Sequence, residues 1–360
     1  MKKIAIVNHN LGSGGAEKLI YDMAIELKKR GVNFSVILLT SVNCIYGKKL
    51  IEQGIEVIYL SSKWDIYSPK NIVRLVKVLR EYDVIHAHIY SVQLWTAIAS
   101  LFLGKDKIYL TTEHSTNNNR RGKGLFKFLD RWMYSKYNKL VSINEETESA
   151  LKNWIGNSYS YEIIKNGVDI ESILQAPKIL REELGYDQED ILICQVARLN
   201  IVKNQECSIR AMRYLPDNYK LLLVGEGEKR EDLELLVKDL DLEDRVKFLG
   251  YRTDVPSILK MSNVSILTSK YEGLSISCLE SMLLLPFIGS NVPGIRDVVK
   301  GAGLLFEDEN SKELSEKIKE LIIDKEEYEN IEARCFERAK EYDIRKTVDK
   351  YLKIYQGGKR

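Results

Sequence analysis

Residues 264–286 read VSILTSKYEGLSISCLESMLLLP, and they predict a strand, a short loop and a helix in succession. The apolar run 264–267 is typical of a buried strand. The helix is expected from Cys278 to about Leu285, because Pro286 cannot continue it. A strand followed at once by a helix is the repeating unit of parallel sheets, so this stretch indicates an α/β protein.

The loop and helix start of this unit carry two carboxylates, Glu272 and Glu280. Gly273 and the serines between them leave backbone N–H groups open near the positive end of the helix dipole, which favours an anion such as a phosphate. The alternative is a capping box, in which Ser277 and Glu280 satisfy each other's backbone amides. A capping box does not require Glu272, so the second carboxylate favours a ligand site.

The same strand–loop–helix pattern repeats along the chain. It first occurs at residues 4–30, where the loop glycines differ in spacing from the dinucleotide pattern G-x-G-x-x-G and are also compatible with a plain tight turn. Further strands are expected at 33–39, 55–60, 84–88, 107–112, 139–143, 161–165, 191–196 and 221–224, with helices at 69–81, 91–103, 123–137, 145–155, 310–340 and 344–356. Such alternation predicts open parallel sheets that bind ligands beyond the carboxyl ends of their strands.

Length and composition limit the class of protein. A chain of 360 residues suits two domains. Its five cysteines are widely spaced without a C-x-x-C pair, which indicates reduced thiols in the cytoplasm. Residues 84–104 carry no charge and are long enough to cross a bilayer, but their histidines and Gln93 favour a buried strand and helix. The start of the chain predicts a strand and no signal peptide.

Charge is divided unevenly along the chain. Residues 1–168 contain 24 basic and 15 acidic residues, whereas the remainder contains 30 and 37, so we expect the first half to meet an anionic partner. Residues 120–139 combine seven basic residues with the aromatic residues Phe126, Phe128, Trp132, Tyr134 and Tyr137. This pattern predicts contact with an anionic membrane surface; the alternative is a solvated helix whose aromatic rings pack on the core.

The histidines gather in the first 114 residues, at or just past predicted strand ends: His9, His86, His88 and His114. Because the ends of parallel strands share one edge of a sheet, we expect them near a ligand. Each one alone is as compatible with a hydrogen-bonded loop histidine. A three-histidine metal site is a further alternative, but no carboxylate accompanies the pattern on a rigid element.

The pair Glu272 and Glu280 resembles the E-x7-E motif of the retaining glycosyltransferases of family 4 (GT4). Further motifs resemble this family in the family's order: GGAE at 14–17, T-x-H-S at 112–115, NGVD at 166–169, R-x4-K at 198–203, V-G-x-G at 224–227 and F-L-G at 248–250. The chain departs from the family at Ala197, where glycine is usual, and at 291–297, where NVPGIRD stands in place of G-G-x-P-E.

The resemblance implies a GT-B fold, with two Rossmann-like domains, a crevice between them and a C-terminal helix that crosses back to the first domain. It implies an acceptor-binding domain at 1–168, completed by the helix at about 341–360, and a donor-binding domain at 169–340.

The resemblance also implies roles for single residues. His114 and Glu272 would be catalytic, Arg198 and Lys203 would stabilise the diphosphate, and Glu280 would hold the ribose hydroxyls. The implied substrate-binding residues are Gly14, Gly15, Arg198, Lys203, Gly225, Tyr251, Glu272, Gly273, Leu274, Ser275 and Glu280.

The implied activity is retaining, metal-independent transfer of a sugar from a UDP-linked donor. The implied acceptor is a lipid-linked glycan intermediate of surface polysaccharide synthesis. We therefore expect no cofactor, no metal and no nucleic acid, and a cytoplasmic protein at the inner face of the cell membrane. The alternatives are a nucleotide-sugar epimerase or hydrolase of the same fold, and a non-catalytic scaffold of a polysaccharide assembly.

Overall fold

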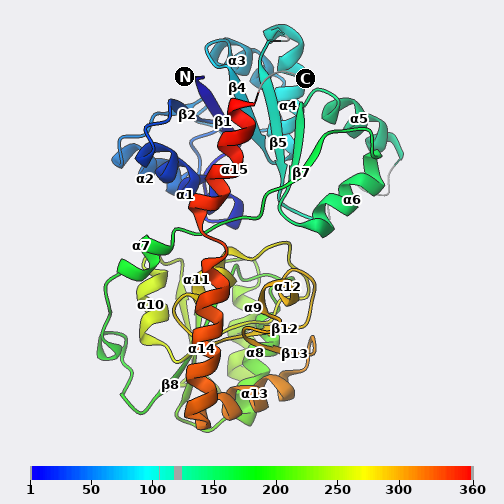
Figure 1. Cartoon of the computed structure of the whole chain (residues 1–360). Helices are drawn as coiled ribbons and strands as arrows, with labels where there is room; N and C mark the ends of the chain where they lie inside the picture. The colour runs from blue at the N-terminus through cyan, green and yellow to red at the C-terminus, as the bar shows by residue number, and fades with distance from the viewer. Residues whose placement is uncertain (1, 105, 117–123, 358–360) are drawn as a thin grey trace. The chain divides into compact units, whose positions relative to one another are not determined.

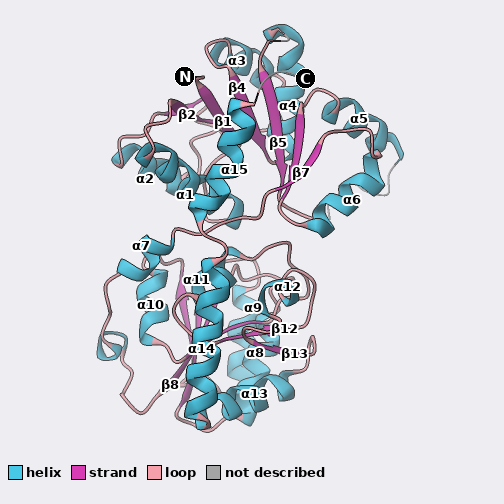
Figure 2. Ribbon diagram, in the orientation of Figure 1, coloured by secondary structure: helices cyan, strands magenta, loops and turns pink. Residues whose placement is uncertain are grey.

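The computed structural model describes residues 2–104, 106–116 and 124–357, and it divides into two compact units (Figure 1). Unit 1 contains Met1–Gly167 together with Ile344–Arg360, and unit 2 contains Val168–Asp343. The last helix, red in Figure 1, therefore belongs to the unit in which the chain starts. Each unit has its own parallel sheet covered by helices (Figure 2).

The strands of the unit 1 sheet lie in the order β3-β2-β1-β4-β5-β6-β7, and neighbouring strands are parallel. Their bounds are β1 (Ile4–Asn8), β2 (Phe34–Leu38), β3 (Val57–Tyr59), β4 (Val84–His88), β5 (Ile108–Glu113), β6 (Lys139–Ser142) and β7 (Tyr161–Ile163). The order changes direction at β1, which pairs with β2 on one side and β4 on the other. In open parallel sheets a ligand site lies beyond the strand ends at such a switch point.

Two helical layers cover this sheet. One face packs against α1 (Gly15–Lys29), α2 (Ile45–Glu52) and α15 (Ile344–Gln356). The other packs against α3 (Lys70–Leu79), α4 (Tyr90–Leu103), α5 (Gly124–Tyr134) and α6 (Glu145–Ile155). Alternate residues of β1 face the two layers, with Ile6 in the first core and Val7 in the second, as the two-residue period of a strand requires.

The uncharged run 84–104 forms β4 and α4, which confirms its prediction as a core strand and helix. Among the residues that the structure describes, no helix is both long and apolar enough to cross a membrane. All five cysteines are buried and unpaired, as their spacing predicts.

The chain passes between the units twice, and the two passages lie side by side. Val168 forms a parallel bridge with Asp343, and its N–H donates to the Tyr342 carbonyl at 2.9 Å. A Cβ on Gly167 would lie 2.6 Å from the Cα of Ile344, so only glycine permits this approach. The glycine of the NGVD stretch therefore has a structural reason.

The unit 2 sheet has the order β10-β9-β8-β11-β12-β13, again with parallel neighbours. Its strands are β8 (Ile191–Val196), β9 (Tyr219–Val224), β10 (Val246–Gly250), β11 (Val264–Leu267), β12 (Phe287–Ser290) and β13 (Leu304–Phe306). Its helices are α7 (Ile170–Gln175), α8 (Gln205–Ala211), α9 (Arg230–Asp239), α10 (Val255–Met261), α11 (Ile276–Met282), α12 (Arg296–Val299), α13 (Ser311–Ile323) and α14 (Lys325–Lys340), with 3₁₀ turns at Arg181–Leu184 and Met212–Tyr214.

Candidate active site

The E-x7-E stretch joins β11 to α11 in unit 2, and its helix differs from the prediction. The helix α11 begins at Ile276 and ends at Met282, two to three residues earlier at each end than expected. The Ser275 side chain caps it by accepting from the Cys278 N–H at 3.4 Å. The capping box of Ser277 and Glu280 is therefore wrong as an interpretation, because both residues already lie inside the helix.

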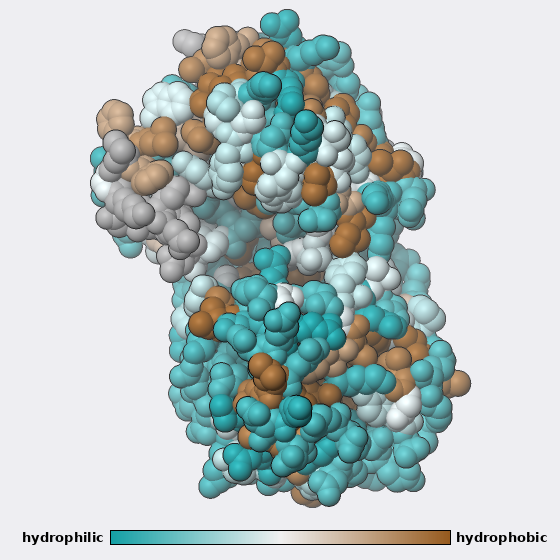
Figure 3. Space-filling view, turned by 180° about the vertical axis from the view of Figure 1, so that it is seen from behind, coloured by the Kyte–Doolittle hydropathy of each residue, from teal (hydrophilic) through white to brown (hydrophobic). Residues whose placement is uncertain are grey.

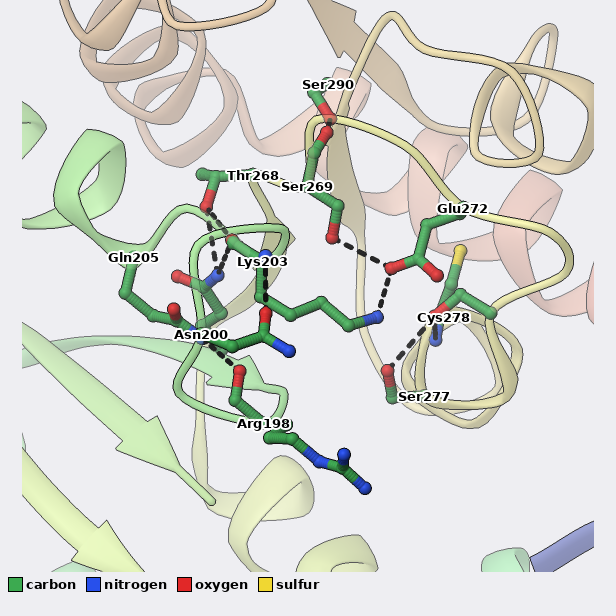
Figure 4. A network of polar contacts seen from close by, with 12 residues as sticks. Arg198, Asn200, Lys203, Gln205, Thr268, Ser269, Glu272, Ser277, Cys278 and Ser290 are labelled. Atoms are coloured by element: carbon green, nitrogen blue, oxygen red, sulfur yellow. Dashed lines mark hydrogen bonds and ion pairs between the residues drawn. The ribbon is translucent and has the colours of Figure 1, made fainter. Parts of the chain in front are cut away.

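Glu272 and Lys203 meet although 69 residues separate them in the chain. Lys203 Nζ forms an ion pair with Glu272 Oε1, and Ser269 Oγ donates to the same oxygen at 2.8 Å (Figure 4). The two side chains are 20% and 12% exposed, so solvent screens this pair only weakly. Ser269 is held in turn, since its carbonyl accepts from Ser290 Oγ at 2.5 Å.

The loop that carries Lys203 follows the end of β8. Its backbone is fixed by the Asn200 side chain, which accepts from the Lys203 N–H at 3.0 Å, and by Thr268 Oγ1, which donates to the Lys203 carbonyl at 3.0 Å. Arg198 is exposed, and its guanidinium lies below the Lys203–Glu272 pair in the view of Figure 4. No ion pair to Arg198 occurs within the described part of the chain. An unpaired guanidinium beside a held ammonium is a cationic site open to an anion.

Three further predicted donor residues are placed in different ways. Gly225 has a φ of 141°, and a Cβ there would collide with the Ala197 carbonyl, so glycine is required by packing at the ends of β8 and β9. Leu274 is partly buried and packs against the unit 2 core. Glu280 lies in α11 and is 9% exposed.

Three more predicted residues are at element ends. Tyr251 follows β10 and is 37% exposed, so its ring is accessible. Gly14 is the N-cap of α1, and Gly15 is the first residue of that helix. Their backbone N–H groups therefore lie where an α-helix leaves its amides without intrahelical partners.

The predicted histidines of unit 1 meet at the ends of β4 and β5. His88 is the last residue of β4, and its Nδ1 lies 3.0 Å from Nε2 of His114, which directly follows β5. His86 differs from the prediction because it lies inside β4 and is fully buried. Its two nitrogens contact Tyr355 Oη and Thr112 Oγ1, both at 2.8 Å.

These histidines are neutral near pH 7. Burial lowers the pKa of His114 to about 4 from the usual 6.5. Burial also lowers the pKa values of His86 and His88 well below that value, and the neighbouring histidines add to the effect. Neutral His114 can accept or donate a hydrogen bond, but it carries no positive charge for an anion.

Buried polar atoms without a hydrogen-bond partner collect at this edge of the sheet, counting only partners that the structure describes. They include His88 Nε2 and His114 Nδ1. Sequence reasoning missed others at the ends of β1 and β6 and beyond β7: Asn8 Oδ1, Ser142 Oγ and Asn166 Oδ1. A buried polar atom is costly when unpaired, so such a cluster at one strand edge is typical of a site for a polar ligand. The sequence feature that could have predicted these three residues is a polar side chain at or after the end of a strand.

A metal centre does not form from the histidines. In the described ranges, no group of three or more His, Cys, Asp or Glu residues is placed to hold a metal ion. The basic stretch at 120–139 lies partly outside the described residues, since 117–123 are not described. In its remainder, Tyr134 and Tyr137 are buried in the core, whereas Phe128 is 77% exposed.

Two family models together match most of the chain. The model "Glycosyltransferase Family 4" matches residues 13–172, and the model "Glycosyl transferases group 1" matches residues 178–338. The chain is 30% identical over 258 residues, 66% of each chain, to an Escherichia coli UDP-Gal:alpha-D-GlcNAc-diphosphoundecaprenol alpha-1,3-galactosyltransferase.

Another relative and a solved structure match almost the full length. The chain is 25% identical, over 99% of its length and 100% of the relative's, to a Campylobacter jejuni N-acetylgalactosamine-N,N'-diacetylbacillosaminyl-diphospho-undecaprenol 4-alpha-N-acetylgalactosaminyltransferase. Anabaena HepE, crystallised with UDP and glucose, superposes with a TM-score of 0.85 at 22% identity, covering 98% of this chain and 99% of HepE. With these matches and the two parallel-sheet units, the chain belongs to glycosyltransferase family 4 and has the GT-B fold.

Proposed function

We propose that this glycosyltransferase moves a sugar, with retention of configuration, from a UDP-linked donor to a lipid-linked glycan intermediate of surface polysaccharide synthesis. The observation that carries the proposal is the contact between Lys203 and Glu272, with Arg198 unpaired nearby. The printed names of two relatives, which specify diphosphoundecaprenol-linked acceptors, support the acceptor class.

The donor residues lie in unit 2. Cleavage of the sugar–phosphate bond leaves negative charge on the departing diphosphate and positive charge on the sugar. Arg198 and Lys203 are placed to stabilise the diphosphate, and Glu272 to position the sugar and stabilise its charge. Arg198 and Lys203 supply the positive charge that stabilises the diphosphate, so the proposal needs no metal ion.

Without a donor, Lys203 and Glu272 neutralise each other. A bound diphosphate therefore competes with the Glu272 carboxylate for the Lys203 ammonium. When the lysine turns to the phosphate, the carboxylate is released toward the sugar. Donor binding therefore exchanges one ion pair for another: Lys203 leaves Glu272 for the diphosphate, and the Glu272 carboxylate becomes available to the sugar.

The acceptor residues lie in unit 1. His114 directly follows β5. Counting only described residues, its Nδ1 has no hydrogen-bond partner, and neither do Asn8 Oδ1 and Ser142 Oγ at the same edge. A glycan presents many hydroxyls, each of which both donates and accepts, so it suits such an edge. Retention is compatible with double displacement and with same-face attack assisted by the leaving phosphate.

The test of donor binding is thermal stabilisation by nucleotide sugars. A ligand at 100 times its Kd adds about 2.7 kcal/mol. We expect UDP-sugars to raise the melting temperature of the wild type, and Glu280→Gln to lose most of that shift while its own melting temperature changes little. Gln keeps the size of the side chain, but it replaces one of the two accepting oxygens with an NH₂ donor and removes the negative charge, so its hydrogen bonds to two ribose hydroxyls are weaker. The matched control is Glu332→Gln, a half-buried glutamate on α14.

Three results would contradict the proposal. If UDP-sugars raise the melting temperature of neither the wild type nor Glu280→Gln, the proposed donor class is wrong. If they raise both melting temperatures equally, Glu280 does not contact the ribose. Incubation with donor and lipid-linked acceptors must also form a glycosidic bond. Release of free sugar or an epimer without an acceptor would instead favour a hydrolase or an epimerase.

Unit 1 also presents a basic and apolar outer face on α3, α4 and α5, which we propose meets an anionic membrane. These helices carry both exposed apolar and exposed basic residues. The apolar ones are Val73, Leu101, Phe102 and Phe128, and the basic ones are Lys70, Lys77 and Arg131, with Arg80 directly after α3. The helix α4 packs against both α3 and α5, so the three helices lie in one layer on the same face of the sheet. Brown apolar groups are also visible on the upper, unit 1 part of Figure 3. Apolar insertion and attraction to anionic lipids act together on such a face.

This surface gives a prediction with a matched control. Phe128→Asp places a negative charge on the proposed membrane face, so binding to vesicles with anionic lipids should fall sharply at low salt. Ile323→Asp should bind as the wild type does, because Ile323 is 78% exposed on α13 of unit 2. Vesicle co-sedimentation measures both variants. The proposed membrane face would be contradicted if both variants lost vesicle binding equally, or if the wild-type protein did not bind anionic vesicles.

A further inference from the structure

A buried chain of polar contacts links the C-terminal helix α15 to β4 and β5 of unit 1. Tyr355 Oη lies 2.8 Å from His86 Nδ1, and His86 Nε2 lies 2.8 Å from Thr112 Oγ1. Thr112 Oγ1 also lies 2.9 Å from Tyr351 Oη. Both nitrogens of His86 are therefore occupied, and its ring is fixed by groups that are themselves buried.

His88 rests on this fixed ring. The centroids of the His86 and His88 rings are 3.9 Å apart, with an interplanar angle of 39°. His88 is completely buried, so its side chain cannot rotate out into solvent. Its Nδ1 is thus held 3.0 Å from Nε2 of His114.

The proton count of this pair is restricted. A neutral imidazole carries one N–H, and only one hydrogen can lie between His88 Nδ1 and His114 Nε2. Either both rings carry their proton on Nδ1, or both carry it on Nε2. A neutral imidazole side chain intrinsically favours the Nε2–H form, and because the two rings must change together this preference counts twice for the second arrangement. His88 Nε2 then carries the N–H, which has no partner among the residues described. His114 Nδ1 is then a lone pair, and it has no partner among the residues described.

We infer that His88 is a positioning residue that holds His114 with an unprotonated Nδ1, so that this nitrogen accepts the hydrogen bond of an acceptor hydroxyl. The inference rests on the proposed function, which gives His114 its place toward the acceptor. The C-terminal helix takes part through Tyr351 and Tyr355, because they fix the ring on which His88 lies. His88 itself does not touch the acceptor hydroxyl.

The tautomer can be measured directly, because the chain has only four histidines. Nitrogen-15 NMR of histidine-labelled protein should show His114 in the Nε2–H form in the wild type. His88→Phe keeps a ring against His86 but removes the acceptor, so His114 should become a mixture of tautomers. His88→Asn should keep the Nε2–H form, because its amide oxygen can lie near the former Nδ1 and accept the same bond.

Activity provides the second readout. With His88→Phe, kcat should fall about tenfold or more while KM for the nucleotide sugar stays within about twofold, because ground-state donor binding is untouched. His88→Asn should restore kcat, which a merely structural role would not require.

The inference is overturned if wild-type His114 carries its proton on Nδ1, or if His88→Phe leaves both tautomer and kcat unchanged. Should His88→Phe fail to fold, the wild-type spectrum and the His88→Asn variant still decide. Failure of the proposed function looks different: His114→Phe would then keep full transfer, whatever the NMR spectra show.

Discussion

Replacing Lys203 by alanine should lower kcat/KM for the nucleotide sugar about 100- to 1000-fold, and Arg198→Ala should act in the same direction. Each change removes a positive charge that we propose stabilises the departing diphosphate, and loss of one such group costs roughly 3–4 kcal/mol in the transition state. Lys203→Ala has a second effect, since Glu272 then lacks the cation that neutralises it in the free protein. Steady-state kinetics with the donor that the wild type uses measures both variants.

The matched control is Lys229→Ala, which removes another lysine of unit 2 from an ion pair, the exposed one with Asp232. Its kinetics should stay close to wild type, because surface pairs contribute little. Circular dichroism should show all three variants folded, because the changed side chains lie in loops or at the surface. Full turnover by both Lys203→Ala and Arg198→Ala would show that the diphosphate binds elsewhere.

Acid should unfold unit 1 well before unit 2. The folded forms of His86, His88 and His114 have lowered pKa values because they are buried, whereas in the unfolded chain they titrate near 6.5. The folded unit thus binds fewer protons, so the stabilisation is present above pH 6.5 and is lost as pH falls toward 4. For His114 alone, with its pKa of about 4, the loss at pH 5 is about 2 kcal/mol.

The two units can be followed separately. All four histidines and all four tryptophans lie in the first 167 residues, so tryptophan fluorescence reports unit 1 alone. Between pH 7.5 and 5 the urea midpoint by fluorescence should fall steeply. The part of the circular dichroism change that belongs to unit 2 should move little, because that unit contains no histidine. A fluorescence midpoint that is constant over this range would contradict the neutral histidine cluster.

Local signals in the chain were sufficient for the longer elements. The helix α6 has the predicted bounds, 145–155, because Asn144 caps it by accepting from the Thr147 N–H and Gly156 follows its end. The helix α15 also has its predicted bounds, since its apolar residues recur on one face. The short elements α2, α7, α10, α12 and β13 were not predicted, because tertiary packing and not local propensity stabilises so few residues.

The candidate site was predictable as residue types at strand ends but not as contacts. The ion pair between Lys203 and Glu272 depends on β8 and β11 being neighbours in the sheet, which no local pattern specifies. The start of α11 was misplaced because Ser275 and Ser277 are both suitable caps, and the buried side chains around them decide which one serves. The contact of Tyr355 with His86 joins residues 269 apart in the chain, beyond any sequence period.

The return of α15 to unit 1 has a consequence for biosynthesis. Unit 2 is an uninterrupted segment, so its sheet can be completed before the ribosome has added α15. Unit 1 cannot be completed by then, because Ile344, Val348 and Tyr351 cover its core and are translated after unit 2. A nascent chain stalled before residue 344 would hold a finished second half and a first half with an open apolar face, which is the kind of surface that chaperones bind.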